Sequence, residues 1–303
     1  MDTFLQQVVN GLTAGSVYAI VALGYTMVYG IIQLINFAHG EVVMIGAMVA
    51  FTVINALAPS GLPALAVVLI GTGCAVPVCI LVGYSMERLA YRPLRHAPRL
   101  TPLITAVGMS FIVSNISLAL YGVDYESGSD LIPQGAAFTI GDIIVTWKLV
   151  VALAIIVPAL FVLSWFVGYT RQGKAMRAVA QDTEASAMMG INVNRTISVT
   201  FLIAGALAAV AGLVFLLEYN IRYDTGFELG LIAFTAAVLG GIGNLAGAVV
   251  GALVIGFVQS FNEGLTWHAP GGDWTRSIVF GILIAVLVFR PEGILGEQTP
   301  EGA

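Results

Sequence analysis

The amino-acid sequence predicts an all-α fold, a polytopic helical membrane protein with about eight transmembrane helices and one short or re-entrant segment. Of its 303 residues, 58% are hydrophobic and only 10% are charged, whereas soluble domains carry about 25% charged residues. Apolar stretches of about twenty residues recur between short polar breaks, which suits helices that cross about 30 Å of hydrocarbon. A transmembrane barrel would need segments of about ten residues that alternate apolar and polar, and the sequence contains none.

The apolar stretches set the order of the spans. We expect spans at 12–32, 38–56, 62–86, 102–121, 147–168, 197–217, 245–262 and 276–290. A ninth apolar piece, Leu229–Leu239, is too short to cross alone, so it is expected to be re-entrant or tilted. Residues 1–303 are expected to form a single transmembrane domain, with one polar loop at about 169–196.

Two glycine-rich passages, residues 30–41 and 240–247, interrupt the apolar pattern. Each contains an asparagine, Asn36 or Asn244, followed by an apolar residue and an alanine. Such passages predict broken helices, whose free backbone groups are tolerated where they line a cavity or pack against protein. One interpretation is a weak internal repeat; the other is that glycine-rich turns simply look alike.

A few polar residues are expected near the membrane interior. Asn36, His39 and Glu41 fall at the first break, and Asn244 falls at the second. Ionisable groups in a membrane are costly and often functional. These four residues are therefore candidates for the translocation path, with a structural tie between spans as the alternative.

The basic residues predict the orientation. Nine of the twelve Lys and Arg residues lie in two loops or at the C-terminal end: Arg88, Arg92, Arg95, Arg99, Arg171, Lys174, Arg177, Arg195 and Arg290. Because basic loops stay in the cytoplasm, both loops and the C-terminus are expected there, and the acidic loop 122–146 and the N-terminus are expected outside. This role suffices to explain the arginines between 88 and 99. The net charge of −5 gives no indication of a nucleic-acid partner.

Small residues are expected at the contacts between helices. Gly243, Gly247 and Gly251 are spaced to share one helical face, and Gly205 and Gly212 mark a second small-residue surface. Small faces let helices approach closely in lipid, so packing is the expected role of these glycines.

The two cysteines, Cys74 and Cys79, lie in one apolar span. They are expected to be buried packing residues rather than parts of a disulfide framework or a metal site.

A polar island, residues 173–192, lies within the otherwise apolar sequence. It is expected to form one short amphipathic helix, because Lys174, Arg177, Gln181 and Glu184 recur at spacings of three and four. Gly190 is suited to the left-handed position that ends a helix. An amphipathic helix between two long spans is a candidate docking surface.

The segment Gly168–Ala175 comes close to a phosphate-binding loop but does not fit one. Ala175 replaces the hydroxyl residue that binds magnesium, and a membrane span precedes the loop instead of a buried strand. If ATP is used, another subunit must bind it. Two functions then remain, an energised transporter subunit with a docking helix, which we favour, and a passive channel for small neutral solutes.

Several motifs resemble one protein family. Glu184–Gly190 resembles the E-A-A-x-x-x-G loop of ABC importer permeases, with Ser186 in place of the second alanine and without the distal Ile-x-Leu-Pro end. The longer runs resemble the H-type permease of high-affinity branched-chain amino acid (Liv) ABC importers: Gly173–Asn192, Tyr25–Gly46, Glu87–Leu94, Ala233–Gly247 and Pro291–Gly296.

This resemblance implies a subunit of the bacterial inner membrane that is not itself an enzyme. Its expected partners are an M-type permease in a pseudo-symmetric heterodimer, two cytoplasmic ABC ATPases that bind ATP and magnesium, and a periplasmic amino-acid-binding protein. This chain is expected to bind no cofactor and no metal. The implied substrates are Leu, Ile and Val, with urea or short amides as the alternative, since the same family serves them.

The resemblance also assigns the polar island as the coupling helix, which would contact one ATPase. The residues expected to couple the two subunits are Gly173, Arg177, Ala178, Asp182, Glu184, Ala185, Gly190 and Ile191.

Overall fold

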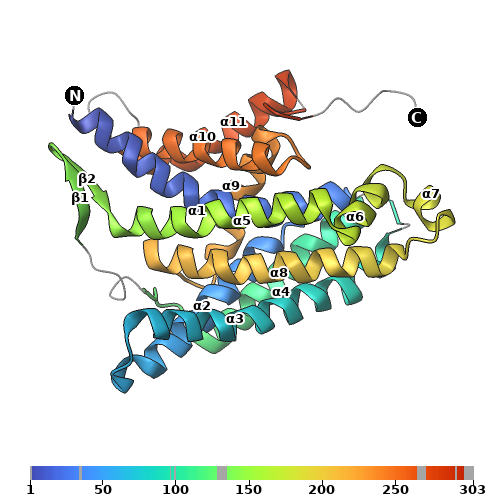
Figure 1. Ribbon diagram of the computed structural model, residues 1–303, viewed down its shortest axis with the longest axis horizontal. Helices are drawn as coiled ribbons and strands as arrows, with labels where there is room; N and C mark the ends of the chain where they lie inside the picture. The colour runs from blue at the N-terminus through green and yellow to red at the C-terminus, as the bar shows by residue number, and fades with distance from the viewer. Residues whose placement is uncertain are drawn as a thin grey trace. The chain divides into compact units, whose positions relative to one another are not determined.

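The computed structural model describes residues 2–33, 36–95, 97–98, 100–127, 135–264, 271–290 and 292–296 (Figure 1). In this part of the chain, eight helices are long and apolar enough to cross a membrane. They are α1 (Asp2–Ile32), α2 (His39–Leu57), α3 (Ala64–Met86), α4 (Leu100–Tyr121), α5 (Trp147–Tyr169), α8 (Val193–Glu218), α10 (Leu245–Gly264) and α11 (Thr275–Phe289), which reaches the length of a span together with the turn before it, from Gly272. The predicted spans are confirmed, although α1 begins at Asp2 rather than at residue 12.

The remaining elements are short. They are the helical turns η1 (Ala58–Ser60), η2 (Glu87–Tyr91, a π-helix), η3 (Arg92–Leu94) and η5 (Gly272–Trp274), the helices α6 (Arg171–Gln181), α7 (Thr183–Met188) and α9 (Thr225–Gly240), and the strands β1 (Ala136–Ile140) and β2 (Ile143–Thr146). The short apolar piece expected at 229–239 forms α9, a helix of 16 residues, and its re-entrant or tilted course stays a prediction.

The chain divides into two compact units. The first consists of Met1–Thr26, Gly135–Leu160 and Ile232–Ala303, and the second of Met27–Gln134 and Phe161–Leu231. Helices α1, α5 and α9 each contribute residues to both units.

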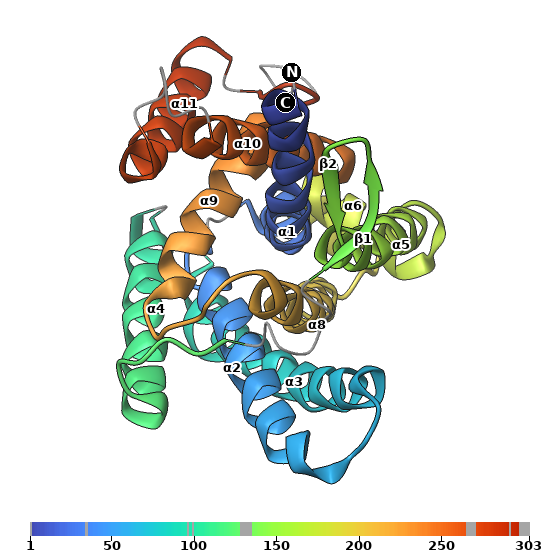
Figure 2. The same ribbon diagram turned by 90° about the vertical axis from the view of Figure 1, so that its left-hand side faces the viewer.

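In the second unit, α2, α3 and α8 run side by side (Figure 2). Glycines make this packing possible. A side-chain carbon added at Gly212 on α8 would lie 2.6 Å from the backbone nitrogen of Ala47, and one added at Gly205 would lie 2.7 Å from the carbonyl oxygen of Cys79. The predicted small-residue surface on α8 is thus a contact surface for both neighbouring helices, in keeping with close backbone approach in lipid.

In the first unit, α10 packs against both α1 and α9 through small residues. A side-chain carbon added at Gly15 on α1 would lie 2.8 Å from the Cα of Leu253 on α10. One added at Gly251 on α10 would lie 2.7 Å from the backbone nitrogen of Gly240 on α9. Of the three glycines predicted to share one helical face, Gly247 and Gly251 lie on α10 but Gly243 does not. Gly243 precedes α10 and has a φ of +91°, so it belongs to the turn rather than to the helix.

A β-hairpin is an addition to the predicted all-α fold. Strands β1 and β2 pair in antiparallel register around the turn at Gly141, whose φ of +63° favours glycine. The hairpin is tied to α1 by Gln6, whose side chain donates to the carbonyl of Ile144 at 3.1 Å and accepts from its N–H at 2.8 Å. An isolated two-stranded hairpin is marginal in water, so this contact with a distant residue stabilises what local sequence alone would not.

The cysteines are only partly as predicted. Cys79 is buried on α3, where its thiol lies 3.4 Å from the carbonyl oxygen of Val42. Cys74, on the same helix, is exposed. Its apolar surroundings in the sequence predicted burial incorrectly, because a span is apolar on its outer face as well.

We expect Gly212→Val to disrupt the crossing of α2 and α8. The added carbons would overlap backbone atoms that cannot rotate away, and overpacking of this kind costs about 1–3 kcal/mol or more. The melting temperature of the purified protein in detergent should fall clearly. Gly108→Val on α4 is the matched control, because nothing lies within 4 Å of its side-chain position. Equal melting temperatures for the two variants would contradict this packing.

Candidate coupling site

The polar island begins at a sharp corner between α5 and α6. Thr170 caps α6, since its hydroxyl accepts from the N–H of Gly173 at 3.0 Å and donates to the carbonyl of Phe166 at 2.6 Å. A side-chain carbon at Gly173 would lie 2.6 Å from the Cα of Val167, so only glycine fits this close corner. The near match to a phosphate-binding loop is therefore a corner between two helices.

The prediction of a single helix over 173–192 is wrong, because the chain forms two helices that meet at Asp182. This residue is extended, with φ −152° and ψ 110°, and its carboxylate accepts from the N–H of Ala185 at 2.9 Å. Aspartate caps a helix far better than it continues one. The side-chain spacing that predicted one continuous face therefore holds only as far as Gln181.

The second helix, α7, ends at Met188, and Gly190 takes the predicted left-handed position after it. Gly190 has a φ of +84°. Its N–H donates to the carbonyl of Ala187 and that of Ile191 donates to the carbonyl of Ser186, both at 3.0 Å. This pair of bonds is the Schellman motif. Asn192 then caps α8 by accepting from the N–H of Arg195 at 3.0 Å, so one turn sets the angle between α7 and a membrane span.

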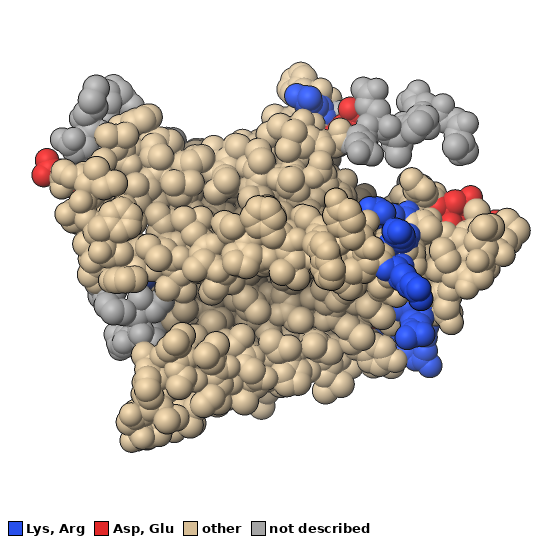
Figure 3. Space-filling model, in the orientation of Figure 1, with Lys and Arg blue, Asp and Glu red and all other residues tan. Residues whose placement is uncertain are grey.

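The two helices present a mixed surface. On α6 the buried side is formed by Gly173, Met176 and Val179, while basic side chains point outward. Lys and Arg gather in a band at the end of the second unit that carries α6 (Figure 3). At the end of α7, Met188 and Met189 are each 83% exposed. Flexible methionines in the open are typical of surfaces that bind another protein.

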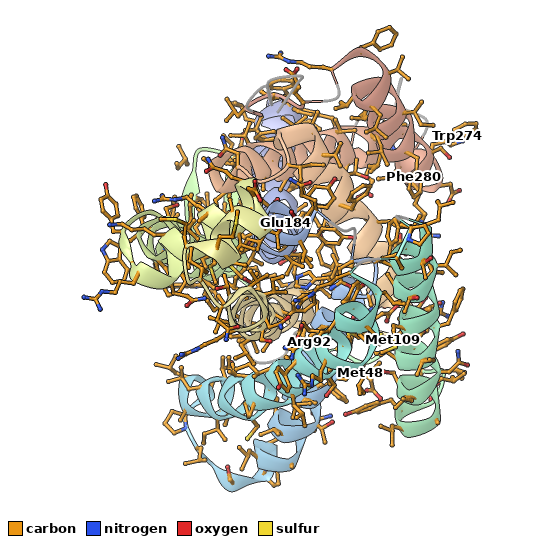
Figure 4. The ribbon with its side chains drawn as sticks, turned by 90° about the vertical axis from the view of Figure 1, so that its right-hand side faces the viewer. Met48, Arg92, Met109, Glu184, Trp274 and Phe280 are labelled. Carbon is orange, nitrogen blue, oxygen red and sulfur yellow. The ribbon has the colours of Figure 1, made fainter. Side chains whose placement is uncertain are left out.

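The residues predicted to couple the subunits take different positions. Arg177, Glu184 and Gly190 are exposed, and Figure 4 labels Glu184. The other exposed or half-buried members are Ala178, Asp182, Ala185 and Ile191. Gly173 is buried at the corner with α5, so it positions α6 and offers no surface of its own. Met188 and Met189 were not among the predicted residues, although two methionines in a polar island are a signal that could have identified them.

A buried ion network next to this surface was also not predicted. Glu87 has no exposed surface and accepts from Arg92 at 3.0 Å and from Arg95 at 2.5 Å. It also accepts from the hydroxyl of Ser198 on α8 at 2.9 Å, and Arg95 donates to Asn194 at 2.6 Å. The network ties the end of α3 to the first turns of α8, with Arg92 beside that helix (Figure 4).

Arg92 and Arg95 do more than set the orientation of the chain in the membrane, because both pair with the buried Glu87. Burial lowers the pKa of the Arg95 guanidinium, and the negative charge of Glu87 opposes that shift. Two arginines that the sequence assigned to orientation alone thus also neutralise a buried carboxylate. The signal in the sequence was the spacing of five and eight residues between Glu87 and its partners.

Three of the four translocation-path candidates come together where α2 begins. Asn36, His39 and Glu41 are all buried. Asn36 accepts from the phenol of Tyr91 at 2.7 Å, and Glu41 accepts from the hydroxyl of Ser110 at 2.8 Å. Polar side chains from α2, η2 and α4 therefore meet at the first predicted helix break.

Asn244 has a different role at the second break, in the first unit. Its side chain caps α10 by accepting from the N–H of Gly247 at 3.0 Å, and it donates to the carbonyl of Leu295 at 2.8 Å. Asn36 caps no helix in this way. The shared sequence pattern thus corresponds to two different uses of asparagine, which favours chance resemblance over an internal repeat.

Comparison with known proteins places the chain in a family. A family model described as "Branched-chain amino acid transport system / permease component" matches residues 7–288. The chain belongs to this family of ABC importer permeases. It is a multi-pass membrane protein and, like its relatives, a transport subunit.

The relatives are similar over nearly their whole length. The high-affinity branched-chain amino acid transport system permease protein BraD of Pseudomonas aeruginosa is 42% identical, covering 98% of this chain and 97% of the relative. LivH of Escherichia coli K12 is 41% identical with the same coverage. The fructose import permease FruG of Bifidobacterium longum is more distant, at 27% identity over 83% of this chain and 74% of its own.

A solved structure agrees on the fold. A metal-chelate type ABC transporter in an inward-facing conformation has a TM-score of 0.51, with 17% sequence identity, and covers 93% of this chain and 85% of its own. This likeness supports the ABC permease fold alone.

We expect Glu87→Gln to loosen the start of α8. The substitution keeps the shape of the side chain but leaves two arginines without their negative partner, and breaking a buried pair in this way costs about 3 kcal/mol. The measurement is thermal unfolding of the purified protein. The exposed Arg88→Gln removes a charge from the same helix end and should change stability by less than about 0.5 kcal/mol. A stable Glu87→Gln protein would show that the network does not hold α3 to α8.

Proposed function

We propose that this chain is the permease subunit of an ATP-driven importer that carries the branched-chain amino acids Leu, Ile and Val across the bacterial inner membrane. The observation that carries the proposal is the α6–α7 surface, two short capped helices between membrane spans that end in exposed Met188 and Met189. The substrate class follows from the printed functions of the full-length relatives at 41% and 42% identity.

The proposed assembly has four kinds of partner beyond the bilayer itself. A second, M-type permease completes the pathway, two cytoplasmic ATPases bind ATP and magnesium, and a periplasmic protein delivers the amino acid. This chain needs no cofactor of its own in that scheme. The band of Lys and Arg beside α6 supports a cytoplasmic position for this surface.

The coupling step requires a rigid connection between the docking surface and a span. Gly190 and Asn192 fix the angle between α7 and α8 through backbone hydrogen bonds, and Glu87 joins the start of α8 to α3. A movement of α7 would therefore be passed to two spans rather than absorbed in a flexible loop. We infer that ATP-driven movement of an ATPase would change the pathway by this route.

Other functions are less well supported. The same architecture can import urea or short amides, which differ from amino acids in lacking opposite charges. A passive channel for small neutral solutes has no need of a capped docking surface between two spans. The Asn-Pro-Ala motif of water and glycerol channels is also missing, since Phe37 and Leu245 follow the two asparagines.

The decisive variant is Gly190→Val in the complete complex in vesicles. At a φ of +84°, a β-branched residue is strained by about 1–2 kcal/mol, which should turn α7 away from its ATPase. Uptake of leucine is expected to fall about tenfold while ATP hydrolysis continues. Gly122→Val is a matched control, since Gly122 has a φ of +81° and, like Gly190, nothing within 4 Å of its side-chain position.

The outcome of this experiment separates the alternatives. Normal uptake by Gly190→Val would contradict the coupling role of α7. Equal loss with Gly122→Val would show a general effect of backbone strain. Flux of urea or amino acids through vesicles that hold this chain alone, without ATP, would establish the passive channel instead.

A further inference from the structure

A buried carboxylate lies at the start of α2, beside the middle of α4. The side chain of Glu41 is fully buried, and one of its oxygens accepts from Ser110 at 2.8 Å. Its other oxygen, Oε2, has no hydrogen-bond partner among the described residues. Ser110 stands halfway along the span Leu100–Tyr121. A carboxylate at that depth is costly unless it is paired, so a second partner is expected during function.

The chain approaches Glu41 again at the start of α9. A side-chain carbon at Gly226 would lie 2.8 Å from the Cα of Glu41, so the first turn of α9 lies directly against it. Ser114, one turn beyond Ser110 on α4, donates to the carbonyl of Tyr223 at 2.7 Å. Residues one turn apart on a helix are separated by about 5–6 Å. The non-helical residues before α9 therefore lie close to Glu41.

This non-helical segment carries an ion pair that is open to solvent. Arg222 binds Asp224 with two donors, through its Nε at 2.7 Å and through its terminal nitrogen. The two side chains are 32% and 43% exposed. The guanidinium lies 4.7 Å above the ring of Tyr125 and 5.6 Å from that of Tyr223, which holds it in place. The pair can thus be reached by a solute, whereas Glu41 is enclosed.

The charges of these three side chains suit one class of ligand. Asp224 is paired with Arg222, whereas Glu41 nearby has one oxygen without a partner among the described residues, so the group has a place for an additional cation. A free amino acid supplies an ammonium group, and its carboxylate can replace Asp224 as the partner of Arg222 in the same two-donor geometry. A neutral amide has no charges to exchange with the ion pair. Discontinuous helices around a polar point at the membrane midplane are a recurrent setting for transport sites.

We propose that Glu41, Arg222 and Asp224 form a substrate site that binds the charged end of a free amino acid, with the ammonium group at the two carboxylates and the carboxylate at Arg222. This inference rests on the proposed import of amino acids and adds the chemical reason for choosing them over urea. In the proposed site, the hydrogen bond from Ser110 holds Glu41 in position, and the ring of Tyr125 holds the guanidinium of Arg222.

The test is leucine uptake by the complete complex in vesicles, with the binding protein in excess. Glu41→Gln keeps a group that can accept from Ser110 but has no charge, and Asp224→Asn does the same on the accessible segment. Each is expected to lower the maximal uptake rate about tenfold without changing the melting temperature. Glu41→Asp should recover part of the rate, which a purely structural role in filling space would not explain. Asp142→Asn, at the exposed hairpin turn, is the control and should import at the normal rate.

The possible results lead to different conclusions. Normal uptake by both Glu41→Gln and Asp224→Asn would overturn the proposed site while leaving the importer function intact. If Glu41→Gln fails to fold, Asp224→Asn decides alone by the same criterion. Absence of ATP-dependent leucine uptake by the unmodified complex would instead refute the proposed function itself.

Discussion

The absence of hydrogen-bond partners in hydrocarbon constrains every part of this structure. Backbone groups in the spans must be satisfied within helices, and where a helix breaks, side chains or close packing must replace the missing bonds. Asn244 makes such replacements at the second break, where its side chain bonds to the carbonyl of Leu295 and the N–H of Gly247. The bond from Tyr91 to Asn36 at the first break instead joins two buried side chains. Because these solutions need particular neighbours, the polar residues of the chain concentrate at breaks and helix ends, which is also where its candidate sites lie.

The same constraint explains how coupling can be achieved with few residues. Helices in lipid gain little from apolar burial against one another, so close glycine contacts and buried polar ties determine which spans move together. Gly205 and Gly212 bring α8 against two neighbours, and Glu87 adds a charged tie at the end of α3. A surface attached to the first residue of α8 is therefore attached to a group of helices. Asp182 and Gly190 give that surface a defined shape.

Much of the fold could be predicted from the sequence because apolar length alone identifies a membrane-spanning helix. The spans, the short α9 and the role of Gly190 follow from length, glycine chemistry and spacing. The break at Asp182 was missed because the spacing of side chains does not show whether an aspartate continues one helix or caps the next. The hairpin was missed because its stability depends on Gln6, far away in the sequence. Spacing could indicate neither that Glu87 is buried nor that Glu41 meets Ser110, since both depend on how distant segments pack.

The central claim is that the end of α7 contacts an ATPase, and crosslinking tests it most directly. A cysteine introduced as Met188→Cys, modified with a photoactivated crosslinker in the complete complex, would report its nearest neighbour. The account predicts a crosslink to an ATPase subunit whose yield changes when ATP binds, and none from Asp142→Cys on the hairpin. Crosslinks from position 188 only to lipid or to another membrane subunit would contradict it.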